Sequence, residues 1–240
     1  MQHIPLEKLF LLDIETVSFA EHFHMLDEEW KELWNEKIFK SLPANITPEE
    51  YYPQRAAILA EFAKVVCIST GYLTKANNKW QLKIKSFCGN DEKILLSHFI
   101  NLTNQMHGGS KRWIFTGHNV KEFDVPFLCR RMLVNHIDIP SYMDFQNLKP
   151  WDTPILDTLH LWRFGDYKHY TSLKLLAATL GVPSPKSDID GSKVGKVFWQ
   201  DKNLTRISDY CEKDVATVAN IILRFKNLPL LSDEEITFVR

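Results

Sequence analysis

The sequence predicts one α/β domain that carries a helical insertion after its first strand. Short apolar or β-branched runs alternate along the chain with segments whose apolar residues recur at helical spacing. Neither an internal repeat nor a linker divides the 240 residues, a length that suits one large domain or two small ones. We therefore expect a single domain over residues 1–240, with the insertion at about 20–63.

Composition excludes several classes of protein. Hydrophobic residues make up 45% of the chain and charged residues 25%, as in soluble globular proteins. Twenty-nine basic residues stand against thirty acidic ones, which excludes a histone-like nucleic-acid binder but not an enzyme with few, local phosphate contacts. The four cysteines are scattered, and neither a signal-peptide pattern nor a long apolar run is present. These features predict a cytoplasmic protein that does not enter a membrane.

The first strand and the insertion follow each other in the N-terminal quarter. The apolar run over residues 9–14 ends in acids and predicts a buried strand. Residues 21–40 are acidic and aromatic, and residues 48–62 begin Pro-Glu-Glu after Thr47, which predicts a helix with Thr47 as its N-cap. Residues 7–63 hold twelve acids and five bases, so the insertion is the acidic part of the chain.

The middle and the C-terminal part alternate between strands and helices. A β-rich run over 64–73 and an alternating run over 80–87 flank a turn at 75–78, which predicts an antiparallel hairpin. The other expected elements are a helix over 91–106, a strand over 113–116, a helix over 123–134, a helix over 171–180 with Thr171 as N-cap, an exposed loop over 183–196, the longest helix over 204–223 and a short helix from 232.

Asp13 and Glu15 form the first candidate motif, in Leu-Leu-Asp-Ile-Glu-Thr. Residues i and i+2 of a strand leave the same face, so the two carboxylates lie together at the end of a central strand. Two like charges at this spacing repel unless they are protonated or bridged by cations. The alternative interpretation is a solvated strand end, where acids are common.

Two further motifs each add a carboxylate. Asp124 ends Gly-His-Asn-Val-Lys-Glu-Phe-Asp and lies in the first turn of a helix, where it could also serve only as a capping acid. Tyr210 and Asp214 are four residues apart on the longest helix, and Asp214 adjoins its apolar stripe. A buried acid needs a partner, which a metal ion or the Tyr210 hydroxyl could supply.

The three motifs together supply four carboxylates and a phenol from one strand and two helices. Nucleases and polymerases use such sets to hold two divalent ions about 3.5–4 Å apart. Hard oxygen ligands favour Mg²⁺ or Mn²⁺ over zinc. We therefore expect a site for two such ions.

The order Asp-x-Glu, Asn-x3-Phe-Asp, Tyr-x3-Asp resembles the DEDD 3′–5′ exonucleases of the ribonuclease H-like fold. The tyrosine is typical of the DEDDy branch, because the sister branch has histidine where this chain has Asp209. The residues of the motifs most resemble those of the proofreading domain of family B DNA polymerases and of a stand-alone bacterial group related to it. The resemblance runs from Phe10 to about Arg224. It implies a mixed sheet, antiparallel in strands 1–3 and then parallel, flanked by helices.

The resemblance also implies roles for the motif residues. Asp13 would bridge both metals, Glu15 and Asp214 would complete the site of the metal that carries the attacking water, and Asp124 would hold the second. Tyr210 would orient the water, since a phenol with a pKa near ~10 is a poor base at neutral pH.

Substrate-binding residues are implied in the same way. Thr16, Asn119 and Phe123 match positions that hold the 3′-terminal nucleotide. In addition, residues 163–202 carry a net charge of +3 with interleaved aromatic residues, among them Lys168 and Tyr170, which suits a groove for a single strand. The alternative for this segment is a solvated loop.

The sequence therefore predicts a metal-dependent 3′–5′ exonuclease that acts on single-stranded DNA or frayed 3′ ends and releases nucleoside 5′-monophosphates. Its partner would be nucleic acid, and the sequence identifies no protein partner. An exoribonuclease on the same fold is the first alternative, because no residue declares a contact to a 2′-hydroxyl. A non-catalytic scaffold that binds nucleic acid or protein is the second.

Overall fold

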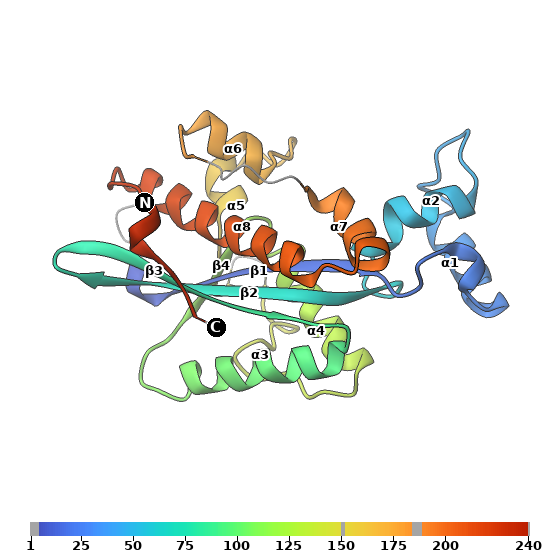
Figure 1. Cartoon of the computed structure of the whole chain (residues 1–240), viewed down its shortest axis with the longest axis horizontal. Helices are drawn as coiled ribbons and strands as arrows, with labels where there is room; N and C mark the ends of the chain where they lie inside the picture. The colour runs from blue at the N-terminus through green and yellow to red at the C-terminus, as the bar shows by residue number, and fades with distance from the viewer. Residues whose placement is uncertain (1–4, 150–151, 184–188, 240) are drawn as a thin grey trace.

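The computed structural model describes residues 5–149, 152–183 and 189–239, in which six strands form one mixed sheet (Figure 1). The strands are β1 (Leu9–Ser18), β2 (Ala63–Ala76), β3 (Lys79–Cys88), β4 (Ile114–Gly117), β5 (Ile155–Asp157) and β6 (Ile236–Phe238), in the spatial order β5-β4-β1-β2-β3-β6. Neighbours among β1, β2 and β3 are antiparallel, whereas the β1–β4, β4–β5 and β3–β6 pairs are parallel. The predicted mixed sheet is confirmed.

Helices cover both faces of this sheet. The helices of the described residues are α1 (Glu28–Ile38), α2 (Pro48–Arg55), α3 (Glu92–His107), α4 (Asp124–Val134), α5 (Thr158–Arg163), α6 (Leu173–Thr179), α7 (Val194–Lys196) and α8 (Leu204–Phe225). Figure 1 shows α8 across one face and α3 and α4 under the other. Leu9 and Leu11 of β1 pack in the core under α8, while Phe10 and Leu12 pack in the core of α3 and α4. This alternation explains why the first strand is apolar on both faces.

The insertion forms a lobe at the end of β1, made of α1 and α2 (Figure 1). Trp34 and Tyr52 are completely buried in its own apolar core, and the indole N–H of Trp34 donates to the carbonyl of Pro48 at 2.9 Å. Thr47 caps α2 with a capping box, as predicted. The helix ends at Arg55 and not at residue 62, because residues 56–58 tighten into a 3-10 turn from which the chain returns to the sheet.

The β2–β3 hairpin has the predicted turn. Asn77 and Asn78 both adopt positive φ, at 48° and 64°, as the two-residue turns that match strand twist require. The register of the hairpin places Cys67 opposite Cys88, and these two residues form a disulfide. The two cysteines are scattered in sequence but meet in the fold, because the cross-strand register brings together residues that are 21 positions apart.

Three further differences have local causes. The N-cap of α6 is Ser172 and not Thr171, whose carbonyl instead binds His118. β5 and β6 are unpredicted strands of three residues each, too short to show a periodic pattern. The loop expected over 183–196 forms helical turns from residue 191 onward, and Ile189 and Val194 are buried in an apolar core. Residues 190–193 and 196 are exposed, as expected. Residues 184–188 of that loop lie outside the described residues. In the described part of the chain, no helix has the length and apolar content needed to span a membrane.

Candidate active site

Asp13 and Glu15 lie on the face of β1 that is covered by α8. Leu12 and Ile14 point to the opposite core, so the two-residue period of the strand directs both acids toward the helix. A register shift between Glu15 and Thr16 ends the regular pairing with β2. Such bulges redirect side chains next to functional sites.

Asp124 reaches the same place from the start of α4. β4 pairs with β1 only at Leu9 to Leu11, so the backbone of β1 beyond this point has no strand partner on that side. One carboxylate oxygen of Asp124 accepts the backbone N–H of Ile14 at 3.0 Å. Ile14 separates Asp13 from Glu15 in the strand, so this bond holds the Asp124 carboxylate against the segment of β1 that carries both acids. The chain approaches β1 closely at Gly117, where a Cβ atom would lie 2.7 Å from the Leu12 carbonyl oxygen. Glycine is therefore required at the end of β4.

The third motif crosses the sheet on α8. Tyr210 and Asp214 are one turn apart and their side chains form a hydrogen bond. Between them, the thiol of Cys211 lies 3.2 Å from a carboxylate oxygen of Asp13 and donates to it. The sequence interpretation missed Cys211. A cysteine among apolar residues of a helix looks like an ordinary core residue. The one available signal was its position between Tyr210 and Asp214.

The electrostatics confirm that the four acids are close neighbours. Burial raises the pKa of Asp13 well above its usual value, and the charges of Asp214, Glu15 and Asp124 raise it further. Burial, with Asp214 and Asp124, does the same to the pKa of Glu15. Burial is also the main cause that raises the pKa of Asp124 to about 7 and that of Asp214 to about 6. Four carboxylates at this density are costly when all are ionised.

Two consequences follow for the chemistry of the cluster. The pKa of Tyr210 is raised by burial and by the carboxylates of Asp214, Glu15 and Asp13, so its phenol keeps its proton and can donate a hydrogen bond. The pKa of the Cys211 thiol is likewise raised well above its usual value by burial and by Asp13 and Glu15. The cluster thus offers carboxylate oxygens as ligands and two neutral donors beside them.

Divalent cations fit this donor set. Ligand atoms of Asp13, Glu15 and Cys211 lie within 4.8 Å of one another. Glu15 is only 7% exposed, and burial and the charges of Asp214 and Asp124 disfavour its ionised form. An ionised carboxylate in that situation needs a cation.

A fifth acid, Asp157, was not predicted and holds the second motif in place. It lies at the end of β5, and its carboxylate accepts the backbone N–H groups of Asn119 at 2.9 Å, Lys121 at 3.0 Å and Leu159 at 2.9 Å. Asn119 has a φ of 63°, a left-handed conformation that these bonds help to maintain. An acid directly after a short apolar run was the available signal.

The residues implied to bind substrate differ from one another in burial and in their contacts. Thr16 is buried and its hydroxyl donates to the carbonyl of Ala57 at 2.6 Å. Phe123 is half-buried, with its ring on Phe127, and Asn119 is half-buried in the turn before it. Lys168 is exposed. The ring of Tyr170 meets that of His118 at 6.4 Å between centroids, and burial and the charges of Asp124 and Asp157 raise the pKa of its hydroxyl.

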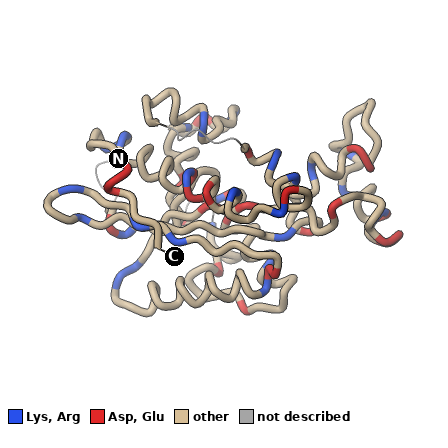
Figure 2. Tube along the Cα trace, viewed as in Figure 1, with Lys and Arg blue, Asp and Glu red and all other residues tan. Residues whose placement is uncertain are grey.

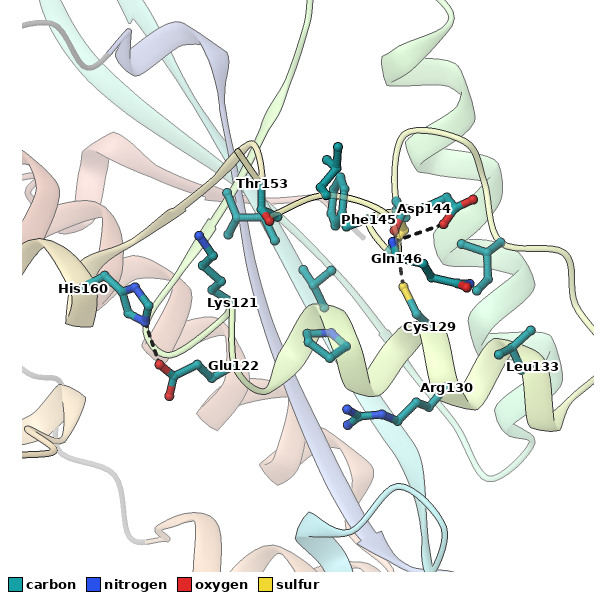
Figure 3. Close-up of a pocket in the computed structure, with 16 residues that line it drawn as sticks. Lys121, Glu122, Cys129, Arg130, Leu133, Asp144, Phe145, Gln146, Thr153 and His160 are labelled. Carbon is teal, nitrogen blue, oxygen red and sulfur yellow. Dashed lines mark hydrogen bonds and ion pairs between the residues drawn. The ribbon is translucent and has the colours of Figure 1, made fainter. Parts of the chain in front are cut away.

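Figure 2 shows basic and acidic residues at many positions along the chain trace. A separate cavity of about 580 Å³ lies between α4 and residues 139–155 (Figure 3). Lys121, Cys129 and Arg130 line it, and at one side Glu122 forms an ion pair with His160 at 2.8 Å. None of the four clustered acids lines this cavity, so the acidic cluster is a separate site.

Comparison with known proteins identifies the family to which the chain belongs. Residues 57–235 match the model of a family described as predicted 3′–5′ exonucleases related to the exonuclease domain of PolB. The matched segment includes the second and third motifs, whereas Asp13 and Glu15 precede it. Among solved structures, the chain is similar to the family B DNA polymerase from the hyperthermophilic archaeon Pyrobaculum calidifontis, with 16% identity and a TM-score of 0.46 over 91% of this chain and 24% of the polymerase. No curated protein matches the chain. The family match extends over most of the sequence, and the chain therefore belongs to the predicted 3′–5′ exonucleases related to the exonuclease domain of PolB.

Proposed function

We propose that this protein is a DEDDy-type exonuclease that uses two divalent ions, Mg²⁺ or Mn²⁺, to hydrolyse single-stranded DNA or frayed 3′ ends. The observation that carries the proposal is the cluster of four carboxylates from β1, α4 and α8, of which Glu15 and Asp124 are buried and Asp13 and Asp214 are half-buried. Burial and the charges of the neighbouring acids raise the pKa values of Asp13 and Glu15. Asp13, Glu15, Asp124 and Asp214 would hold the ions. Bound there, the ions would make water nucleophilic at neutral pH and neutralise charge on the phosphate.

The protein's own groups would arrange the reactants. Tyr210, fixed by its bond to Asp214, is suited to orient the attacking water, and its raised pKa argues against a role as general base. Asp13, on which the charges of the other three acids all act, would be a ligand of both ions. The products would be nucleoside 5′-monophosphates, released one at a time from the 3′ end.

Exposed aromatic side chains on the segment that follows α5 support a single-stranded substrate. Phe164, Tyr167 and Tyr170 are 84%, 68% and 63% exposed along the segment that follows α5. Nucleobases stack on such side chains without regard to sequence. Thr16, Asn119, Phe123 and Lys168 are proposed to complete the contacts with the 3′-terminal nucleotides.

The direct test is a digestion ladder from a 5′-labelled DNA oligonucleotide in Mg²⁺ or Mn²⁺. Wild-type protein is expected to shorten the strand stepwise, chelation is expected to stop the reaction, and Asp13→Ala is expected to abolish it. Asp209→Ala is the matched control, because Asp209 is an exposed aspartate on α8, next to Tyr210. A ladder that Asp13→Ala leaves unchanged would refute the assignment, and a parallel RNA ladder distinguishes the exoribonuclease.

The aromatic segment gives a second expected result. Phe164→Ala is expected to weaken the binding of a single-stranded oligonucleotide by roughly 5- to 150-fold, since one base–aromatic stack contributes about 1–3 kcal/mol. Fluorescence anisotropy on catalytically inactive Asp13→Ala protein measures this without digestion. Phe39→Ala is the control, because Phe39 is 81% exposed on the insertion lobe. Equal effects at Phe164 and Phe39 would contradict the proposed groove.

A further inference from the structure

Cys211 is a fully buried thiol with a specific contact to the candidate active site. Its Sγ lies 3.2 Å from Oδ2 of Asp13 and 3.4 Å from the backbone carbonyl of the same residue. In both contacts the thiol is the donor, because an Asp13 oxygen is the acceptor in each. A buried cysteine that only filled space would not need this orientation.

A row of polar side chains continues from this contact across the sheet. Ser69 stands opposite Asp13 in the register of β1 and β2, and Ser86 stands opposite Ser69 in the register of β2 and β3. The two serine hydroxyls are 2.8 Å apart, and Ser86 donates to the carboxylate of Glu212 at 2.8 Å. Since the single proton of Ser86 goes to Glu212, Ser69 donates to Ser86.

This row locks α8 onto the sheet at one position. Glu212 follows Cys211 directly on the helix, is itself buried, and accepts a second, longer bond from Ser208. Any rotation of the helix that moved Cys211 from Asp13 would also break the Glu212 bond to Ser86. Buried polar networks of this kind hold a unique arrangement when every member is paired.

We propose that Cys211 is a positioning residue, which donates to Oδ2 of Asp13 and thereby fixes the rotamer in which Asp13 presents its carboxylate to divalent ions. The Ser69–Ser86–Glu212 row holds Cys211 in register for that contact. The inference rests on the proposed function, because it assumes that Asp13 is a metal ligand. Groups that orient a ligand from behind commonly change metal affinity or activity by 10- to 100-fold when they are removed.

The test compares Cys211→Ala with Cys211→Ser by Mn²⁺ titration and by steady-state kinetics on a labelled oligonucleotide. Cys211→Ala is expected to weaken Mn²⁺ binding and to lower kcat by about 10-fold or more, with KM for DNA unchanged. Cys211→Ser is expected to recover a large part of both losses, because the hydroxyl also donates. Cys129→Ala, at the other free cysteine, is expected to behave as wild type. Thermal melts establish that each variant is folded.

The outcomes separate this inference from the proposed function. Wild-type Mn²⁺ affinity and kcat in folded Cys211→Ala, while Asp13→Ala is inactive and fails to bind Mn²⁺, would overturn the positioning role alone. Losses in Cys211→Ser equal to those in Cys211→Ala would also overturn it, since they would reflect packing. If Asp13→Ala kept both activity and Mn²⁺ binding, the proposed function itself would be refuted. Should Cys211→Ala not fold, Glu212→Gln supplies the second variant: a reduced Mn²⁺ affinity is expected, and an unchanged one counts against the row.

Discussion

Glu15→Gln is expected to lower the rate of 3′-end hydrolysis by about 10³-fold or more. The substitution keeps the shape of a side chain that is nine-tenths buried but removes its charge, and with it a ligand of the proposed ions. Metal-ion catalysis contributes several kcal/mol, and each 1.4 kcal/mol corresponds to a factor of about ten in rate. Single-turnover measurements at saturating Mn²⁺ would report the chemical step.

The same variant is expected to melt at a higher temperature than wild type in the absence of metal at about pH 8. Glu15 has a folded-state pKa raised well above its unfolded value, so the folded state binds the proton more tightly. Its contribution to stability is fully present below the unfolded pKa of about 4.3 and is lost as pH rises through the folded value. Glutamine has no such loss, so its advantage over wild type should vanish at about pH 4 and grow as pH rises.

Glu7→Gln is the matched control, because Glu7 is an exposed glutamate just before β1. It should change neither activity nor the pH dependence of melting. Mn²⁺ should raise the melting temperature of wild type and of Glu7→Gln but raise that of Glu15→Gln much less. An active Glu15→Gln, or one that is less stable than wild type in metal-free buffer at high pH, would contradict a metal-binding role for Glu15. Because the family match begins at residue 57, this experiment also tests the motif that the comparison does not reach.

Local pattern was sufficient to predict much of the sheet. The apolar run before Asp13, the alternating strand after residue 80 and the two asparagines of the hairpin turn each encode their structure within a few residues. β5 and β6 could not be predicted in this way, because three residues show no period and their pairing depends on strands far away in sequence. The disulfide partners Cys67 and Cys88 likewise become visible only once the hairpin register is known.

The residues of the candidate site also differ in whether local sequence could predict them. Spacing placed Asp13 beside Glu15 and Tyr210 beside Asp214, since both pairs follow from the period of one element. The roles of individual acids came from a resemblance. The residues that hold the motifs in place, Asp157 and Cys211, act across 38 and 198 positions of sequence, and no local pattern marks such partners.

Arg131→Met is expected to lower the free energy of unfolding by about 3–5 kcal/mol, the usual cost of breaking a buried ion pair. Arg131 and Glu92 are both buried and meet through two bonds, at 2.9 Å from Nε and 2.7 Å from a terminal guanidinium nitrogen. The other terminal nitrogen of Arg131 donates to the carbonyl of Ala60 at 2.8 Å. Methionine would leave both acceptors without this donor in a dry interior.

Thermal melting should show the effect as a decrease of roughly 6–20 °C for a domain of this size. Arg130→Met is the control, because Arg130 precedes Arg131 on α4 and is exposed. A decrease of the same size in both variants would show that the helix, and not the ion pair, is sensitive to substitution.

A double-mutant cycle isolates the origin of the expected loss. Glu92 also accepts the Val65 N–H at 2.7 Å and the Asn135 amide at 2.8 Å, so it joins β2, α3 and α4. Because most of the cost of Arg131→Met is the unpaired charge left on Glu92, adding Glu92→Gln should cost less than the sum of the two single changes. Strict additivity would mean that the two side chains act independently. A double change that costs less than the sum would mean that Arg131 and Glu92 act as one buried network. Through the Arg131 bond to Ala60, that network connects the end of the insertion to α4, the helix that begins with Asp124.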